Sequence, residues 1–458
     1  SPWRSAARIV NGGEQLMAND IFTIVGGTTF DDRKVNITVT DGSISHIGSE
    51  VHGREISATG KHILPGLVDL HTHLREPGKE DSETVESGSR AAVKGGYTAI
   101  SAMPNTNPVA DTAGVVEQVF RLGEESGLCD VFPIGAVTSG QAGKELAEIL
   151  AMANSAAKVR IFSDDGHCVS DSLVMRRALE YVKMFDGVIA QHAQDPHLTV
   201  GAQMNEGIIS SKLGLKGWPA VAEEGIIARD VLLADHVQSR LHVCHVTTAG
   251  GVEIIRWAKA RGINVTAEVT PHHLLLTEDA AESYDPVFKV NPPLRTEKDV
   301  MALREGLADG TIDIIATDHA PHSSENKECE WQAAAFGMLG LESAFSIGYL
   351  TMVKSGLLSL AALVDRMSIA PAKIAGYGEH GGTIQMGQRA NLCIVDLSKA
   401  WTVDRDAVQS KSRNTPFHGR ELPAVVERTF FRGKEVSARS EEHTSELQSL
   451  RHLVCRLL

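Results

Sequence analysis

The sequence is organised around His71-Thr72-His73-Leu74-Arg75-Glu76-Pro77-Gly78, which directly follows a mostly apolar run from Ile63 to Leu70. The apolar run predicts a β-strand, so the polar stretch lies at its C-terminal end. Side chains two residues apart point to the same face of a strand, which lets the imidazoles of His71 and His73 reach one metal ion. Two histidines alone indicate a metal only weakly, because polar residues are ordinary at a strand mouth. Their partners must come from other strand ends.

From Leu67 onward the sequence repeats one pattern, in which a short β-branched run ends in polar residues and is followed by helical periodicity. The predicted strand ends are Asp69–His73, Ile100–Asn105, Ile134–Thr138, Ile161–Asp165, Ile189–His192, Val243–His245, Val265–Thr270 and Ile314–Asp318. The predicted helices are Ser82–Lys94, Gly114–Ser126, Lys144–Ala153, Ser172–Met184, Glu223–Ala234, Gly251–Ala260 and Glu297–Leu307, and Pro371 is expected to end the last helical region. This alternation predicts an α/β fold with a (β/α)8 TIM-type barrel over residues 66–377.

Both ends of the chain have β character instead. Residues 35–40 alternate and meet Asp41-Gly42, a pattern typical of a hairpin, and residues 391–396 and 424–431 also resemble strands. We expect residues 17–65 and 378–437 to form one small β-sandwich domain. Met17 is interpreted as the natural start, which makes residues 1–16 a non-native or disordered extension. Residues 438–458 resemble a translated sequencing-adapter oligonucleotide and are predicted to be an artefactual or disordered tail.

Composition and charge limit the kinds of partner. The 458 residues carry a formal net charge of -14, with a pI near 5.7, which argues against a broad nucleic-acid or anionic-membrane surface. The six cysteines have no paired spacing, as expected of reduced thiols. The sequence has no apolar run long enough to span a bilayer and no secretory signal. We therefore predict a cytoplasmic protein.

Residues that commonly bind metals recur at the predicted strand ends, where barrels of this type place their active sites. They are His71 and His73, the pair Asp164-Asp165, His192, His245 and Asp318. Ordinary hydrogen bonding explains any one of them, but not their recurrence at several strand ends. Six ligating side chains exceed the four that one zinc uses, so two metals bridged by a carboxylate fit better. Asp164 or Asp165 is the expected bridge, and only one can ligate, because neighbours on a strand point oppositely.

Three other histidines are expected to have no ligand role. His242 lies three residues before His245 and therefore faces the other side of its strand. His272 and His273 follow a proline and are expected to support the end of their strand.

Five motifs in a fixed order make the chain resemble a class I dihydroorotase of the cyclic amidohydrolase superfamily over residues 20–437. Besides the stretch that begins at His71, they are Met103-Pro104-Asn105-Thr106-Asn107-Pro108, Phe162-Ser163-Asp164-Asp165-Gly166, Asn291-Pro292-Pro293-Leu294-Arg295 and Thr317-Asp318-His319-Ala320-Pro321-His322. The resemblance implies the fold predicted above. It also implies reversible hydrolysis of (S)-dihydroorotate to N-carbamoyl-L-aspartate, in de novo pyrimidine (UMP) biosynthesis.

The resemblance also implies a role for each site residue. Two Zn²⁺ ions would bind per subunit, the first to His71, His73 and Asp318, the second to His192 and His245, with Asp165 bridging both. A hydroxide between the metals would attack a ring amide carbonyl, with Asp318 as the general acid and base. The implied substrate contacts are His73, Arg75, Asn105, Asn291, His322, Phe336 and Gly337. Arg75 offers a planar fork for a substrate carboxylate.

Two other functions remain open at this point. Another cyclic amidohydrolase, of the allantoinase or hydantoinase type, would act on rings that lack the carboxylate that Arg75 would bind. A non-catalytic dihydroorotase-like scaffold for aspartate transcarbamoylase would be marked by missing ligands, whereas all six are present. A homodimer and an association with aspartate transcarbamoylase are partner interactions that the resemblance leaves open.

Overall fold

The computed structural model of this protein describes residues 20–439. Met17, the predicted extension at residues 1–16 and most of the predicted tail at 438–458 lie outside this range. The last strand nevertheless includes Ala438, and the Arg439 guanidinium lies 4.4 Å from the centre of the Trp401 ring. The folded chain therefore reaches two residues into the predicted tail. Within residues 20–439, no helix combines the length and the apolar character that crossing a lipid bilayer requires.

Parallel strands supply the predicted strand ends. A three-stranded sheet contains β6 (Leu67–Thr72), β7 (Tyr97–Ala102) and β8 (Asp130–Pro133), and a five-stranded sheet contains β9 (Ile161–Phe162), β10 (Val188–Gln191), β13 (Arg240–Val243), β14 (Val265–Val269) and β15 (Ile314–Ile315). Single parallel bridges, Gly135 to Phe162 and Thr72 to His319, connect the edges of these two sheets. Each predicted strand end lies at or just beyond the C-terminal end of a parallel strand.

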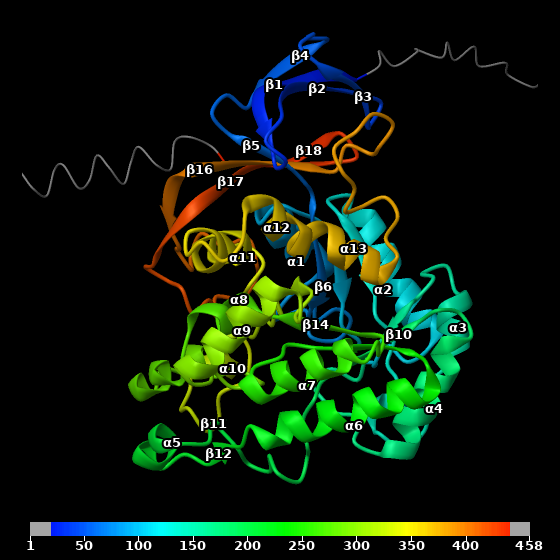
Figure 1. Cartoon of the computed structure of the whole chain (residues 1–458), viewed down its shortest axis with the longest axis vertical. Coiled ribbons are helices and arrows are strands. Elements are labelled where there is room, and N and C mark those ends of the chain that lie inside the picture. The colour runs from blue at the N-terminus through cyan, green and yellow to red at the C-terminus, as the bar shows by residue number, and fades with distance from the viewer. Residues whose placement is uncertain (1–19, 440–458) are drawn as a thin grey trace, which may run out of the picture.

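Helices follow these strands much as predicted. They are α1 (Val85–Lys94), α2 (Ala113–Ser126), α3 (Ile149–Asn154), α4 (Ser172–Lys183), α6 (Val221–Val237), α7 (Ala249–Ala260) and α9 (Glu297–Asp309). Successive helices contact each other, α4 against α6 and α6 against α7, along the lower part of Figure 1. Thr84 and Thr296 cap the N-termini of α1 and α9, because each hydroxyl accepts a backbone N–H three residues later.

The start of the third predicted helix and the place of Pro371 were predicted wrongly. α3 begins at Ile149 rather than Lys144, because Thr138 pairs with Leu146 and residues 139–141 form a 3₁₀ turn. Pro371 does not end a helix but lies in the first turn of α13 (Ala370–Ala375). A proline is tolerated there, because the first helical residues have no intrahelical N–H partner to lose.

Several short elements in the connections were not predicted. Between β10 and α6 the chain forms β11 (Met204–Asn205), α5 (Ile208–Leu213) and β12 (Gly217–Trp218). α8 (Pro271–Leu275) follows β14, α10 (Ser324–Lys327) follows β15, and α11 (Ala344–Gly348) and α12 (Leu360–Val364) precede α13. Strands of two residues and single helical turns are too short to show a hydrophobic period.

The two ends of the chain meet in one mixed sheet at one end of the molecule, the top of Figure 1. Its eight strands are β1 (Ile21–Thr29), β2 (Lys34–Thr40), β3 (Ser43–Gly48), β4 (Arg54–Ser57), β5 (His62–Pro65), β16 (Leu392–Thr402), β17 (Glu421–Phe431) and β18 (Lys434–Ala438). The predicted hairpin at Asp41-Gly42 joins β2 to β3. Antiparallel pairing of β5 with β16 connects the N-terminal strands to the C-terminal ones.

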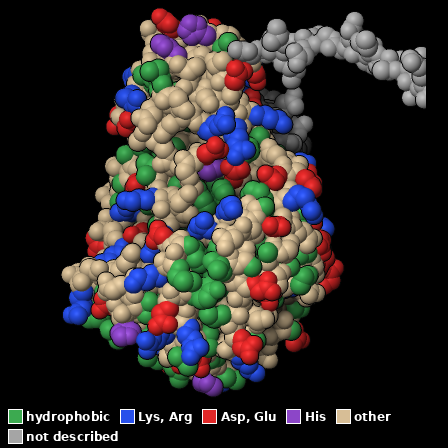
Figure 2. Space-filling model, turned by 90° about the vertical axis from the view of Figure 1, so that its right-hand side faces the viewer, with side chains coloured by type: hydrophobic (Ala, Val, Ile, Leu, Met, Phe, Trp, Pro, Cys, Tyr) green, Lys and Arg blue, Asp and Glu red, His purple; other side chains and the backbone are tan. Residues whose placement is uncertain are grey.

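The core is continuous between this sheet and the parallel strands. Buried residues from β1, β17, α1 and β14 belong to one hydrophobic cluster. The Thr429 hydroxyl in β17 donates a hydrogen bond of 2.6 Å to the carbonyl of Val93 in α1. On the face shown in Figure 2, basic side chains are interspersed with acidic ones rather than gathered into one basic surface.

Candidate metal centre

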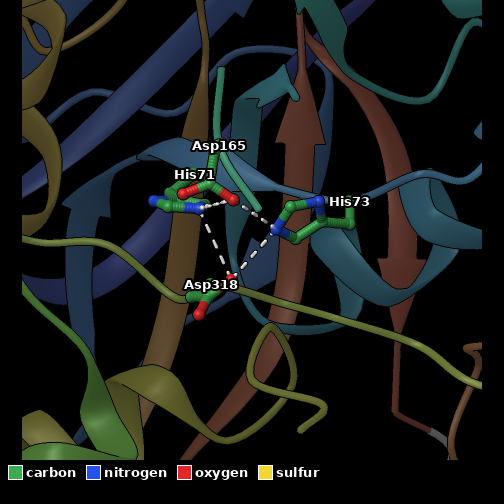
Figure 3. Close-up of side chains that lie close together, drawn as sticks. All are labelled: His71, His73, Asp165 and Asp318. Atoms are coloured by element: carbon green, nitrogen blue, oxygen red, sulfur yellow. Dashed lines mark hydrogen bonds and ion pairs between the residues drawn. The ribbon is translucent and has the colours of Figure 1, made fainter. Parts of the chain in front are cut away.

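Three parallel strands bring four predicted ligands together. His71 lies one residue before the end of β6 and His73 just beyond that end, Asp165 follows β9, and Asp318 follows β15. His73 Nε2 lies 3.1 Å from Asp318 Oδ1 and 3.2 Å from Asp165 Oδ2. His71 Nε2 lies 3.3 Å from Asp165 Oδ2 and 3.4 Å from Asp318 Oδ1. Figure 3 shows all four side chains pointing toward one small space, and they form a group that could hold a metal ion.

A second group lies directly beside the first. His192 follows β10 and His245 follows β13. His192 Nδ1 and His245 Nε2 are 2.9 Å apart, and each lies 3.2 Å from Asp165 Oδ1. These three residues also form a group that could hold a metal ion.

Asp165 belongs to both groups through different oxygens. Oδ2 faces His71 and His73, whereas Oδ1 faces His192 and His245. Asp164 points elsewhere: it accepts hydrogen bonds from the backbone N–H groups of Val137 and Thr138 and from the Thr138 hydroxyl. Of the two neighbouring aspartates, Asp165 therefore has the geometry of a bridge between two cations.

The site is buried and strongly coupled. Burial alone would raise the pKa of Asp165, but the neighbouring His71, His192 and His245 outweigh it and hold that pKa well below its ordinary value. Burial likewise opposes the charge on His71, yet Asp165, Glu268 and Asp318 raise the pKa of this imidazole well above its usual range. Opposite charges therefore stabilise one another here: the Asp165 carboxylate is held ionised, and positive charge beside it is favoured.

The remote nitrogens of three imidazoles are held by hydrogen bonds. Acceptor oxygens lie opposite the ring nitrogens that face away from the centre: Glu268 Oε1 at 2.5 Å from His71 Nδ1, Asn105 Oδ1 at 2.8 Å from His73 Nδ1, and Gln194 Oε1 at 2.8 Å from His192 Nε2. Each remote N–H donates outward, which leaves the lone pair of the other nitrogen for a metal. His71 Nε2 is buried and has no hydrogen-bond partner among residues 20–439. The donor set therefore fits a divalent cation.

Glu268 was not recognised in the sequence analysis. It lies in β14 and is fully buried, and its carboxylate contacts His71, the backbone N–H of His245 and, at 2.9 Å, His242 Nε2. His242 thus supports Glu268 and lies outside both groups above, which agrees with its predicted lack of a ligand role. A single glutamate within the otherwise weakly polar run Val265–Val269 was the signal that could have identified it.

Backbone conformation also distinguishes this site. Arg75, His245 and Asp318 have φ values of 64°, 29° and 46°. Residues other than glycine rarely adopt positive φ values, and backbone strain of this kind concentrates at functional sites. The surrounding contacts hold these three residues where an unconstrained chain would not place them.

The predicted substrate contacts around Arg75 lie next to one another. Arg75 is 7% exposed, and its Nε donates to the Pro321 carbonyl at 3.0 Å. Its NH2 group lies 3.3 Å from His322 Nε2, which in turn lies only 2.7 Å from the Phe336 carbonyl. A carbonyl only accepts, so His322 Nε2 carries the hydrogen and has no lone pair for Arg75. The N–H donors of the Arg75 NH2 group therefore remain available for another acceptor.

Gly337 packs directly against His322. A Cβ atom at Gly337 would lie 2.7 Å from His322 Nε2, and its φ of 149° also favours glycine. Phe336 lies beside Trp218, with ring centroids 6.1 Å apart. The structure therefore places His322, Phe336 and Gly337 in one unit beside Arg75.

The two predicted asparagine contacts have partly free amide groups. Asn105 uses Oδ1 to orient His73, and Asn291 Nδ2 donates to Gln194 Oε1 at 3.2 Å. Asn291 Oδ1 is buried, and no donor in the described part of the chain forms a hydrogen bond with it. Gln194, which the sequence analysis also missed, thus connects His192 to Asn291.

His272 and His273 occupy α8, outside both metal-binding groups. His273 contacts the Thr270 hydroxyl and the Pro292 carbonyl, which agrees with its predicted supporting role. Both ring nitrogens of His272 are buried, and neither has a hydrogen-bond partner within the range that the structure describes. Burial lowers the pKa of His272 to about 4, so this imidazole is neutral.

Solved structures share this architecture. An L-hydantoinase (dihydropyrimidinase) from Arthrobacter aurescens superimposes with a TM-score of 0.80 at 28% identity, covering 92% of this chain and 96% of that chain. A dihydropyrimidinase from Brevibacillus agri NCHU1002 gives 0.78 at 23% identity, covering 91% and 95%. The second likeness shows the fold alone.

Sequence comparison is more specific. The dihydro-orotase-like family model matches residues 60–250. A dihydroorotase from Streptomyces coelicolor is 61% identical over 426 residues, which are 93% of this chain and 97% of that protein. A dihydroorotase from Mycobacterium tuberculosis is 52% identical over 413 residues, 89% of this chain and 96% of that protein. Identity at this level over nearly the whole length, together with the convergent histidines and aspartates, shows that the chain belongs to the dihydroorotase family of the cyclic amidohydrolase superfamily.

Proposed function

We propose that this protein catalyses the reversible hydrolysis of (S)-dihydroorotate to N-carbamoyl-L-aspartate in de novo pyrimidine biosynthesis. Relatives named dihydroorotase, 52–61% identical over most of the chain, support this reaction. The observation that carries the substrate assignment is the buried Arg75, whose NH2 group is not satisfied by His322. Dihydroorotate has a carboxylate on its ring, and hydantoin and dihydrouracil do not.

Two zinc ions are the proposed cofactors. One ion would be held by His71, His73 and Asp318, and the other by His192 and His245. Asp165 would bridge them, because its two oxygens face the two groups separately. When bound, such a pair supplies activation of water near neutral pH and polarisation of the amide carbonyl. The arrangement of hydrogen bonds on the remote imidazole nitrogens supports this ligand set.

Asp318 is the proposed general acid and base. Burial alone would raise its pKa, but His71 and His73 outweigh burial and lower the pKa to about 2, so the carboxylate is ionised. One oxygen faces the histidines, and the other points away from them (Figure 3). In hydrolysis, the ring amide C–N bond breaks and the water oxygen becomes part of the new carboxylate. Asp318 takes the proton from the water and passes it to the departing nitrogen.

Arg75 is proposed to hold the substrate carboxylate. Burial lowers the pKa of its guanidinium to about 10, so the group still carries its charge at neutral pH. Among residues 20–439, no carboxylate is close enough to form an ion pair with Arg75. The remaining proposed contacts are the side-chain NH2 of Asn105, the Oδ1 of Asn291, and the unit of His322, Phe336 and Gly337. Charge-assisted hydrogen bonds of this kind are the stronger ones in proteins.

The domain organisation is also proposed. The parallel bridges at both sheet edges support closure of the strands into a (β/α)8 barrel over residues 66–377. In the small domain of residues 17–65 and 378–437, Phe22 of β1 and Phe430 of β17 are separated by β5 and β16, yet their ring centroids are 5.4 Å apart. In a flat sheet, strands three positions apart would be about 14 Å apart. The sheet therefore folds over on itself, which supports a β-sandwich.

A steady-state assay tests the proposed function. Purified protein loaded with zinc should hydrolyse dihydroorotate, and metal analysis should approach two ions per chain. Failure to turn over dihydroorotate while allantoin or hydantoin is hydrolysed would favour another cyclic amidohydrolase. Failure with all these rings in fully metal-loaded protein would favour a non-catalytic scaffold.

A further inference from the structure

Two lysines are buried near the proposed substrate contacts. Lys289, two residues before Asn291, is 2% exposed, and Lys327 at the end of α10 is 3% exposed. Within residues 20–439, neither amino group forms an ion pair with a carboxylate. Burying a lysine amino group without a nearby carboxylate costs free energy, and hydrogen bonds to other acceptors must offset that cost.

Both amino groups bind backbone carbonyls, most of them in one loop, residues 328–337. Lys289 Nζ donates to the carbonyls of Trp331, Gln332 and Ala334, at 2.7, 3.2 and 2.7 Å. Lys327 Nζ donates to the carbonyls of Ala335 and Lys289, both at 2.8 Å. Residues 328–337 form no helix or strand, so their carbonyls lack the regular backbone partners of such elements. The lysines supply donors to four of these carbonyls, and those of Trp331 and Ala334 belong to buried residues.

The same loop ends at the proposed substrate contacts. The backbone N–H of Gly337 donates to the Lys289 carbonyl at 3.0 Å, and Lys289 Nζ lies 4.4 Å from the centre of the Phe336 ring. The Phe336 carbonyl then fixes the hydrogen of His322 Nε2, which keeps His322 from accepting a bond from Arg75. A shift of the loop would therefore move the carbonyl that determines which donors Arg75 can offer.

We propose that Lys289 and Lys327 are positioning residues for substrate recognition: their amino groups hold the 328–337 loop so that the Phe336 carbonyl keeps His322 as a donor beside Arg75. This inference rests on the proposed function, because it assigns the loop to recognition of the substrate carboxylate. Neither lysine contacts the metal-binding groups, so the effect of removing one should fall on substrate selection and not on metal binding.

The main test is the variant Lys289→Met, which keeps the length of the side chain but removes its donors. The control is Lys212→Met, which removes an exposed lysine paired with Glu282. We expect Lys289→Met to raise KM for dihydroorotate by about tenfold or more, with a smaller change in kcat and an unchanged metal content. The ratio of kcat/KM for dihydroorotate to that for dihydrouracil should fall, because dihydrouracil has no carboxylate. The control should match the wild type.

Amide hydrogen exchange gives a readout that does not need activity. In Lys289→Met, or in Lys327→Met if the first variant does not fold, amides of residues 328–337 should exchange faster while those of α4 and α6 keep their protection. An unchanged KM, or an equal loss for both rings with loss of metal, would overturn the proposal. If the wild type itself does not hydrolyse dihydroorotate, the proposed function fails. Hydrogen exchange tests the lysine contacts separately: unchanged exchange of residues 328–337 in the variants would show that these contacts do not hold the loop.

Discussion

At the scale of single residues, the convergence of the proposed ligands was easier to predict than the groups that orient them. His71, Asp165 and Asp318 follow recognisable β-branched runs, so their position at strand ends was visible in the sequence. Glu268 and Gln194 form hydrogen bonds with the remote nitrogens of His71 and His192, which lie on other strands or strand ends. Which strands become neighbours is decided by the tertiary fold, so no local pattern paired these residues with their histidines.

The choice between the two neighbouring aspartates gives one prediction. Asp165→Ala should abolish activity and reduce the bound metal to one ion or fewer per chain, because both groups lose a ligand. Asp164→Ala should retain both metals but destabilise the protein by about 1–3 kcal/mol, since it leaves the N–H groups of Val137 and Thr138 without their acceptor. Metal analysis and urea unfolding of both variants check this. The reverse pattern would mean that Asp164 is the bridge.

Glu268 gives a second prediction. Glu268→Gln keeps an acceptor for His71 Nδ1 but removes the negative charge that makes this imidazole a stronger ligand. Metal affinity should fall by about 10-fold to 100-fold, as is typical when the partner of a metal-binding histidine is changed. Competition with a chelator measures the affinity, and the exposed Glu282→Gln serves as the control. Equal affinities in the two variants would show that Glu268 does not act through His71.

At the scale of elements, the strands and long helices were predictable from hydrophobic runs, whereas the long connections were not. The connection after β14 consists of short helical turns, and most of the connection after β15 is irregular. Side-chain contacts such as those of Lys289 and Lys327 hold these segments. A lysine in a sequence is in most cases an exposed charged residue. Its burial here depends on carbonyls that only the folded loop presents.

Lys327 should make stability depend on pH. Burial, with the nearby Lys289 amino group, lowers the pKa of Lys327 to about 7. In the unfolded chain, Lys327 has the ordinary lysine pKa of about 10. Between pH 7 and pH 10 the unfolded chain therefore binds more protons than the folded chain, and the free energy of unfolding rises with pH. A neutral amine still has two N–H groups for its two carbonyls.

Urea unfolding at pH 7 and pH 9 measures this contribution. The wild type should gain stability over this interval relative to Lys327→Met, in which residue 327 cannot titrate, although Lys289, whose pKa burial lowers to about 8, remains in both proteins. An identical pH dependence in the two proteins would contradict the expected shift. Lys212→Met, which alters an exposed lysine, should follow the wild type.

At the scale of the whole molecule, the sequence predicted that both chain ends form one unit, because both have alternating β patterns. It did not predict how the strands pair, and β5 with β16 is the pairing that joins the ends. That pairing links residues far apart in the chain, and neither strand carries a local signal for its partner.

Phe430→Ala tests how far this unit supports the molecule. Phe430 is fully buried and stacks on Phe22, so its removal should cost about 3–5 kcal/mol of unfolding free energy. Because the hydrophobic core is continuous, activity and tryptophan fluorescence should be lost together at a lower urea concentration. Met386→Ala, at a residue 63% exposed, should change little. A separate early transition that leaves activity intact would show that the small sheet unfolds independently.

The central claim is that Arg75 selects the substrate while the metals perform chemistry common to the superfamily. The most direct measurement compares kcat/KM for dihydroorotate and dihydrouracil in zinc-loaded wild type and Arg75→Ala. Loss of a buried charge-assisted contact costs about 2–5 kcal/mol. We therefore predict a fall of about 30-fold to several thousand-fold for dihydroorotate, little change for dihydrouracil, and both metals retained. A wild type that prefers dihydrouracil, or an Arg75→Ala variant that slows both rings equally, would contradict the account.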